Sequence, residues 1–158
     1  MMDERALIQH QLAGSHQAVR YGLSEISDDE ARRMPHPVLS PVIWQVGHLA
    51  VVNANFIKRA GATSATALPG AYADLFKSGS GGKADYPPLA QVRQAFDDSH
   101  EALVRVAAEA NLDAADEGPR GLWKNYAGMF EFANAHRWYH IGKIMSLRAL
   151  LGKPRLFG

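Results

Sequence analysis

The sequence contains no cysteine among its 158 residues. Disulfide bonds, thiolate metal ligands and cysteine nucleophiles are therefore excluded. A metal ion bound by this chain must be held by imidazole, carboxylate or water.

An excess of charge of one sign is also missing. The chain has 17 Lys and Arg against 16 Asp and Glu, which gives a formal net charge of +1. A nucleic-acid-binding surface normally shows clustered basic residues, whereas the basic residues here are scattered. We therefore expect no nucleic-acid partner.

Long hydrophobic runs are absent too. No uninterrupted apolar stretch approaches the ~20 residues of a membrane-spanning helix. The first residues, Met1-Met-Asp-Glu-Arg, are charged and lack the apolar core of a signal peptide. The expectation is a cytoplasmic protein without membrane association, built as a single domain over residues 1–158.

Helical periodicity is what the sequence does contain. Apolar residues recur at three- and four-residue steps in four segments: one beginning near Asp3, one from Pro41 to about 61, one over about 88–110 and one over about 124–151. No segment alternates as a strand does. The pattern predicts an all-α fold, a four-helix bundle with a long crossover, residues 61–87, between helices 2 and 3.

Local signals refine the second helix and the crossover. We expect Ser40 to cap this helix, Pro41 to occupy its first position and Gly61 to end it. Gly47 would allow another backbone to approach closely. A loop as long as 61–87 is often functional, although a surface crossover with one short helix explains it equally well.

The chemistry-bearing feature is a set of three histidines. His136 and His140 are four residues apart on the last helix, so both side chains project from one face. His48 falls on the inward stripe of the second helix. Three imidazoles from two helices can bind one divalent ion and leave positions open for water or substrate. The sequence therefore predicts a metal site at these three residues.

A structural role for the histidines is the competing interpretation. A histidine on an apolar helix face is often a hydrogen-bonded core residue. Four further histidines serve for comparison, and we expect them on the surface or in loops, with residues 16 or 100 as the two that could still approach the site: His10, His16, His36 and His100.

Candidate substrate contacts lie on the same helix as His48. Trp44 is one turn before it and Asn55 two turns after it, so both share its face. Other aromatic residues could line a pocket or simply pack: Tyr72, Phe76, Trp123, Trp138 and Tyr139. No general base stands out among Asp97, Asp98 and Glu131, and the spacing turns Glu131 away from the metal face.

Three blocks of sequence resemble the DinB-like superfamily of small bacterial metal-binding bundles. They are Trp44-Gln-Val-Gly-His-Leu-Ala, Leu75-Phe-Lys-Ser-Gly-Ser80, and the run from His136 through His140-Ile-Gly-Lys to Leu151-Gly-Lys-Pro154. The resemblance implies a divalent metal, zinc or nickel, held by residues 48, 136 and 140. It also implies a homodimer.

The same resemblance implies two kinds of function. Several relatives activate a low-molecular-weight thiol, as in bacillithiol and mycothiol S-transferases. The expectation is a metal-dependent transferase or hydrolase that acts on a small-molecule substrate through such a thiol or metal-bound water. The alternative is a metal-binding or regulatory module without turnover. Three nitrogen ligands suit several metals, and the sequence names neither the substrate nor the metal.

Overall fold

The chain folds entirely into helices and loops in the part that the structure, a computed structural model, describes: residues 2–62, 68–82 and 85–155. The elements in chain order are α1 (Glu4–Gly22), α2 (Asp28–Arg32), α3 (Val42–Arg59), α4 (Tyr72–Leu75), α5 (Leu89–Glu109), a 3-10 turn η1 (Pro119–Gly121) and α6 (Tyr126–Leu150). The predicted all-α class is confirmed.

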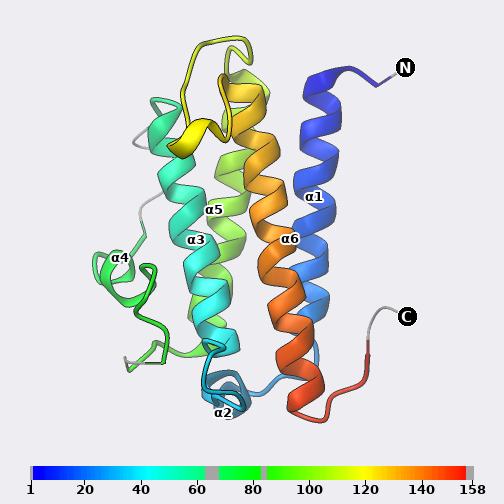
Figure 1. Cartoon of the computed structure of the whole chain (residues 1–158), viewed down its shortest axis with the longest axis vertical. Coiled ribbons are helices and arrows are strands. Elements are labelled where there is room, and N and C mark those ends of the chain that lie inside the picture. Colours follow the sequence, from blue (N-terminus) through cyan, green and yellow to red (C-terminus); the bar gives the residue numbers. More distant parts are fainter. Residues whose placement is uncertain (1, 63–67, 83–84, 156–158) are drawn as a thin grey trace.

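Four long helices form the bundle. α3 packs against α5 and α6, and α1 packs against α6 and α5, so the four helices make a closed ring of contacts. Figure 1 shows α1 and α6 running in one direction and α3 and α5 in the other. Because α3 and α5 are parallel, the chain between them must return along the bundle. This is the long crossover that the sequence predicts.

The core has two apolar halves with a polar layer between them. One half includes Leu49 and Ile144, and the other includes Leu12 and Phe130. Between them lie fully or almost fully buried polar side chains, namely Ser15, Asn53, Ser99, His100 and Arg137. Buried polar groups need hydrogen-bond partners, and four of these bond to one another, while Ser15 donates to the backbone carbonyl of Leu12.

The ends of the helices match the sequence signals in part. Asp3 caps α1 by accepting a hydrogen bond from Ala6 N at 2.7 Å, and Gly61 adopts the expected positive φ of 83°. The predicted start of the second helix is wrong by one residue. Pro41 is extended, with ψ at 160°, so it precedes the first helical residue, and the side chain of Ser40 makes no capping bond.

Two short helices lie between the long ones. α2 falls in the segment that the sequence analysis leaves outside the four helices, and a capping box between Ser27 and Glu30 starts it. α4 lies in the crossover, where Tyr72 and Phe76 are buried against the bundle. The crossover residues 63–67 and 83–84 lie outside the described residues, so the prediction for 61–87 is checked only on the rest.

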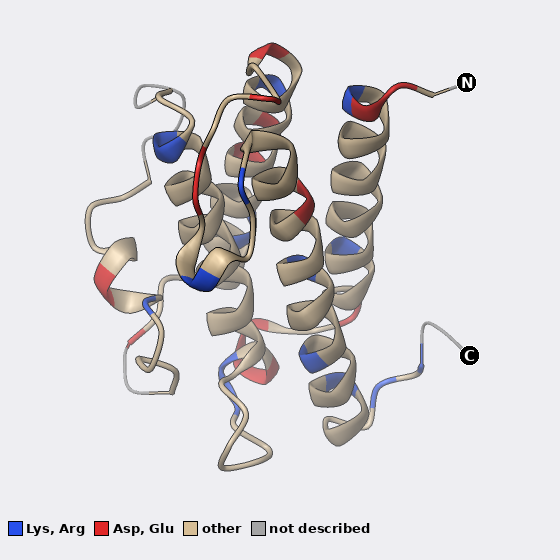
Figure 2. Cartoon of the chain, turned by 45° about the horizontal axis from the view of Figure 1, so that its top comes forward, with Lys and Arg blue, Asp and Glu red and all other residues tan. Residues whose placement is uncertain are grey.

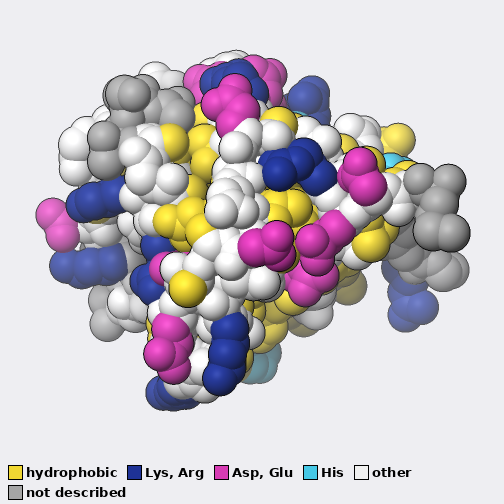
Figure 3. Space-filling view, turned by 90° about the horizontal axis from the view of Figure 1, so that it is seen from above, with side chains coloured by type: hydrophobic (Ala, Val, Ile, Leu, Met, Phe, Trp, Pro, Cys, Tyr) yellow, Lys and Arg dark blue, Asp and Glu magenta, His cyan; other side chains and the backbone are white. Residues whose placement is uncertain are grey.

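Charges are distributed over several elements, with Lys and Arg among Asp and Glu (Figure 2). The end of the bundle seen in Figure 3 shows apolar side chains between charged groups of both signs. None of the described helices is both long and apolar enough to cross a membrane.

Candidate metal centre

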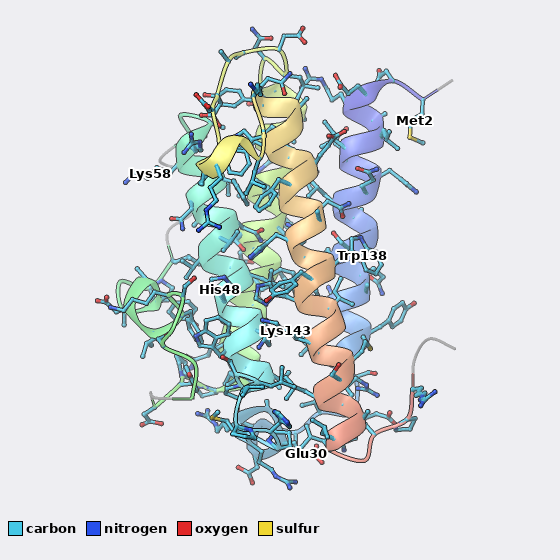
Figure 4. All side chains as sticks on the ribbon, in the orientation of Figure 1. Met2, Glu30, His48, Lys58, Trp138 and Lys143 are labelled. Atoms are coloured by element: carbon cyan, nitrogen blue, oxygen red, sulfur yellow. The ribbon has the colours of Figure 1, made fainter. Side chains whose placement is uncertain are left out.

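The three predicted ligands come together between α3 and α6. His48, His136 and His140 each offer one potential ligand atom, and these atoms all lie within 4.8 Å of one another. The ring centroids of His136 and His140 are 4.5 Å apart, and that of His48 lies 5.0 Å from the second of them. Figure 4 shows His48 on the side of α3 that faces α6. The spacing argument therefore placed all three rings correctly.

Two of the rings are oriented by acceptors on their Nδ1 atoms. His48 Nδ1 lies 2.8 Å from the carbonyl oxygen of Phe76, and His140 Nδ1 lies 2.6 Å from Oε1 of Gln45. The Gln45 amide is itself fixed, because its Nε2 donates to Ser40 O at 2.9 Å. A carbonyl oxygen only accepts, so each Nδ1 carries the proton and each Nε2 keeps its lone pair. This is the arrangement of histidines that bind a metal through Nε2.

The third ring lacks such a partner. His136 Nε2 lies 3.2 Å from His140 Nε2, while His136 Nδ1 is buried without any hydrogen-bond partner among the described residues. The two Nε2 atoms have no hydrogen-bond partner other than each other among the described residues, so both are available to a single ion. A divalent ion that takes imidazole nitrogens fits this donor set.

Burial keeps the three imidazoles neutral. It is the largest cause of the lowered pKa of each ring, and the pKa falls to about 4 for His136 and about 2 for His140. The pKa of His48 is lowered by burial and by the charge of Lys143, against the bond to Phe76 O, which raises it. Neutral imidazole is the form that binds metal, so the rings need not lose protons at neutral pH.

Trp44 lies beside the centre, as its spacing predicts. Its ring stacks on that of His48 at 4.6 Å with an interplanar angle of 11°, and its Nε1 donates to Ser80 Oγ at 2.9 Å. Only 6% of Trp44 is exposed, so its contacts in the structure are mainly with the protein. A contact with substrate stays a prediction.

Gly47 makes room for a side chain. A Cβ atom at this position would lie 2.3 Å from the ring carbons of Phe76. The expectation that another backbone approaches here is therefore wrong, since the neighbour is an aromatic ring. The missing Cβ lets Phe76 lie against α3, which brings its carbonyl to His48.

Asn55 lies away from the three histidines on an exposed part of α3. It borders a groove of about 470 Å³ whose other walls are Val52, Phe56, Lys58, Arg59, Pro119 and Trp123. Phe132 connects this region to the centre, because its ring stacks on His136 at 6.1 Å and contacts Trp123 at 5.1 Å. A role for Asn55 in substrate binding stays a prediction, now attached to this groove.

The remaining aromatic candidates divide by position. Tyr72 and Phe76 are buried in the crossover, while Trp138 and Tyr139 are about half exposed on α6. Only Tyr139 among the exposed pair contacts the centre, with its ring 5.1 Å from that of His140.

The expected surface position is wrong for two of the comparison histidines. His100 is 8% exposed and accepts a hydrogen bond from Arg137 Nη1 at 3.1 Å. His16 stacks on His100 at 3.9 Å and bonds Asp97 at 2.7 Å. Both residues belong to the polar layer, in which the Asp97 carboxylate bonds to His16. Neither histidine is part of the cluster of His48, His136 and His140.

Sequence reasoning missed the residues that orient this region. Gln45 is fully buried one turn before His48, and Arg137 is fully buried between the two α6 ligands. Arg137 donates to Leu12 O at 2.9 Å and to Asn53 Oδ1 at 3.0 Å. The helical period alone places both residues on inward faces, so a polar residue at a core position was the available signal.

Comparison with known proteins supports the resemblance. The family model of the DinB superfamily matches residues 11–144, which include all three histidines. No curated protein and no solved structure matches the chain. Because the family model covers most of the sequence, the chain belongs to the DinB superfamily.

Proposed function

We propose that His48, His136 and His140 bind one divalent metal ion, zinc or nickel, and that the protein uses it as a transferase or hydrolase. The observation that carries the proposal is the fixing of two Nδ1 protons by Phe76 O and Gln45 Oε1. Both bonds leave Nε2 unprotonated in His48 on α3 and in His140 on α6, and potential ligand atoms of the three rings lie within 4.8 Å of one another. Histidines that only pack in a core do not need their ring nitrogens to lie close to one another.

When bound, the metal supplies a Lewis acid that lowers the pKa of a thiol or water molecule. The residues of the chain do the positioning. Gln45 and Phe76 O hold two rings, Trp44 packs against the ring of His48, and burial shields the rings of His48 and His140 from bulk water. The chain has no cysteine, so a low-molecular-weight thiol would enter with the small-molecule substrate as a cosubstrate.

A metal-binding or regulatory module without turnover is the second candidate. The hydrogen-bond partners of the three rings favour this candidate. Among the described residues outside the cluster, these partners are the Gln45 amide and the backbone carbonyl of Phe76. Neither group transfers protons at neutral pH. Any general base would therefore belong to the substrate or act through water.

Metal analysis of untagged protein tests the site. We expect about one equivalent of metal per chain in the wild type, and loss of most of it in His48→Ala and His136→Ala. His10→Ala is the matched control, because His10 is exposed on α1. Equal metal content in all four proteins would refute the site.

Turnover separates the two candidates. The metal-loaded protein is offered a panel of small thiols with electrophilic acceptors, and of hydrolysable esters and amides, with and without chelator. Chelator-sensitive turnover that His136→Ala abolishes supports the enzyme. Full metal occupancy without turnover across the panel supports the binding module. The family's homodimer is likewise a proposal, which sedimentation of the native protein tests.

A further inference from the structure

A lysine lies on the ligand face of α6. Lys143 follows His140 by three residues and His136 by seven, and these spacings place all three side chains on one side of the helix. In Figure 4, Lys143 on α6 lies on the side of the bundle where α6 faces α3, the helix that carries His48. The lysine is half-buried, so its ammonium group belongs to the rim of the centre rather than to open surface.

Tyr139 connects the ammonium group to the centre. Lys143 Nζ lies 4.1 Å from the centroid of the Tyr139 ring, which is a cation–π contact. The same ring packs edge-on against His140 at 5.1 Å. One side of the ammonium group is thus covered by an aromatic ring. A side chain held in this way is positioned rather than freely solvated.

Among the described residues, the charged side chains that shift the pKa values of the three rings are all cations. The charge of Lys143 is among the causes that lower the pKa of His48, His136 and His140, and Arg137 adds to it for His136. No carboxylate contributes to these shifts. Among the described residues, Lys143 has no ion-pair partner within 4.0 Å. A divalent ion would add further positive charge to a region that the protein does not neutralise.

We propose that Lys143 is a specificity residue that selects metal-centre ligands with a carboxylate next to their metal-binding atom. This inference rests on the proposed metal site and adds the substrate class. An ammonium group is a point charge with three donors, which suits one small monoanion. Phosphate groups are commonly held by bidentate arginine or by several donors together, and the described rim offers a single lysine.

A pair of matched thiols isolates the carboxylate. 3-Mercaptopropionate and 2-mercaptoethanol both carry a primary thiol on a two-carbon chain, which ends in a carboxylate in the first and in a hydroxyl in the second. Protein loaded with Co²⁺ reports binding through its visible absorption bands, independently of turnover. We expect the wild type to bind 3-mercaptopropionate about tenfold more tightly than 2-mercaptoethanol, as a charge-assisted hydrogen bond provides.

Substitution of the lysine then assigns the preference. In Lys143→Met the preference should fall to about twofold or less at full Co²⁺ content, because 3-mercaptopropionate should lose more affinity than 2-mercaptoethanol. Lys143→Arg should keep most of it. Arg105→Met is the control, because Arg105 is an exposed cation on α5.

The possible failures are distinguishable. An unchanged preference in Lys143→Met with full Co²⁺ content overturns the role of Lys143 and leaves the metal site standing. If the wild type binds both thiols equally well, the role of Lys143 is also overturned and the proposed metal site still stands. Failure of the wild type to bind Co²⁺ at these histidines overturns the proposed metal site itself, and the role of Lys143 with it.

Discussion

His48 donates its Nδ1 proton to the backbone carbonyl of Phe76 at 2.8 Å, across 28 residues of sequence. The bond joins a metal-site helix to the crossover that follows it. A backbone carbonyl cannot be replaced by mutation of its own residue, so the bond depends on how the crossover packs. That packing depends on Gly47, whose missing Cβ leaves space for the Phe76 ring.

Gly47→Ala should therefore weaken metal binding without touching a ligand. The new methyl group would start 2.3 Å from the Phe76 ring, so the crossover must shift and the carbonyl must leave His48. Loss of such an outer partner typically reduces metal affinity by about 10- to 100-fold. Competition with a chromophoric chelator measures the change.

Gly14→Ala is the matched control for this substitution. Gly14 is also helical, and a Cβ there would meet nothing within 4 Å. Its metal affinity should equal that of the wild type, and its stability should rise by up to about 1 kcal/mol from helix propensity. Equal metal affinity in both glycine variants would show that the crossover does not position His48.

Gln45 should matter through its acceptor oxygen. Gln45→Leu leaves the Nδ1 proton of His140 buried without a partner, and we expect metal affinity to fall by about 10- to 100-fold. Gln45→Glu retains an acceptor at the same reach and should recover most of the affinity. If the Leu and Glu variants bind metal equally well, the hydrogen bond does not orient the ring.

Periodicity was enough to predict the bundle and the three histidines that come together in it. The four long helices repeat their apolar residues over several turns, and His136 and His140 lie on one face for the same local reason. The inward stripe of α3 added His48. Each of these predictions depends on spacing within one helix, which sequence alone determines.

What the sequence could not supply depends on contacts between distant segments. The carbonyl that orients His48 belongs to the crossover, and no side-chain pattern marks a backbone acceptor. The polar layer was missed because its partners come from all four long helices: Ser15, Asn53, His100 and Arg137. A one-residue difference at Pro41 shows a further limit, since a proline suits both the cap and the first helical position.

Arg137 should be one of the most sensitive positions for stability. It is 1% exposed, and burial lowers its pKa to about 9. Arg137→Met would leave the acceptors Leu12 O, Asn53 Oδ1 and His100 Nδ1 without their donor, and the free energy of unfolding should fall by about 3 kcal/mol. Denaturant titration measures this loss.

Arg105→Met is the control, because Arg105 is exposed and pairs with Glu101 only at 3.9 Å. The loss of unfolding free energy in this variant should stay below about 1 kcal/mol. Equal losses would contradict the proposed role of the polar layer.

The metal-free protein should become less stable as the pH falls below about 6.5, the ordinary pKa of an exposed histidine. Burial lowers the pKa of His100 to about 3, of His136 to about 4 and of His140 to about 2. Between pH 6.5 and 4 the unfolded chain therefore binds protons that the folded chain does not. The free energy of unfolding should fall with falling pH by at most about 1.4 kcal/mol per pH unit for each of these histidines.

Denaturant titrations at pH 7.5, 6 and 5 in the presence of chelator measure this dependence. The lowest of these pH values lies above the pH at which the buried or paired carboxylates begin to bind protons. His136→Ala should reduce the slope, because one group that differs between the folded and unfolded states is removed. A free energy of unfolding that stays constant from pH 7.5 to 5 would show that these rings are already accessible to protons in the folded protein, and the neutral, metal-ready state of the centre would then be wrong.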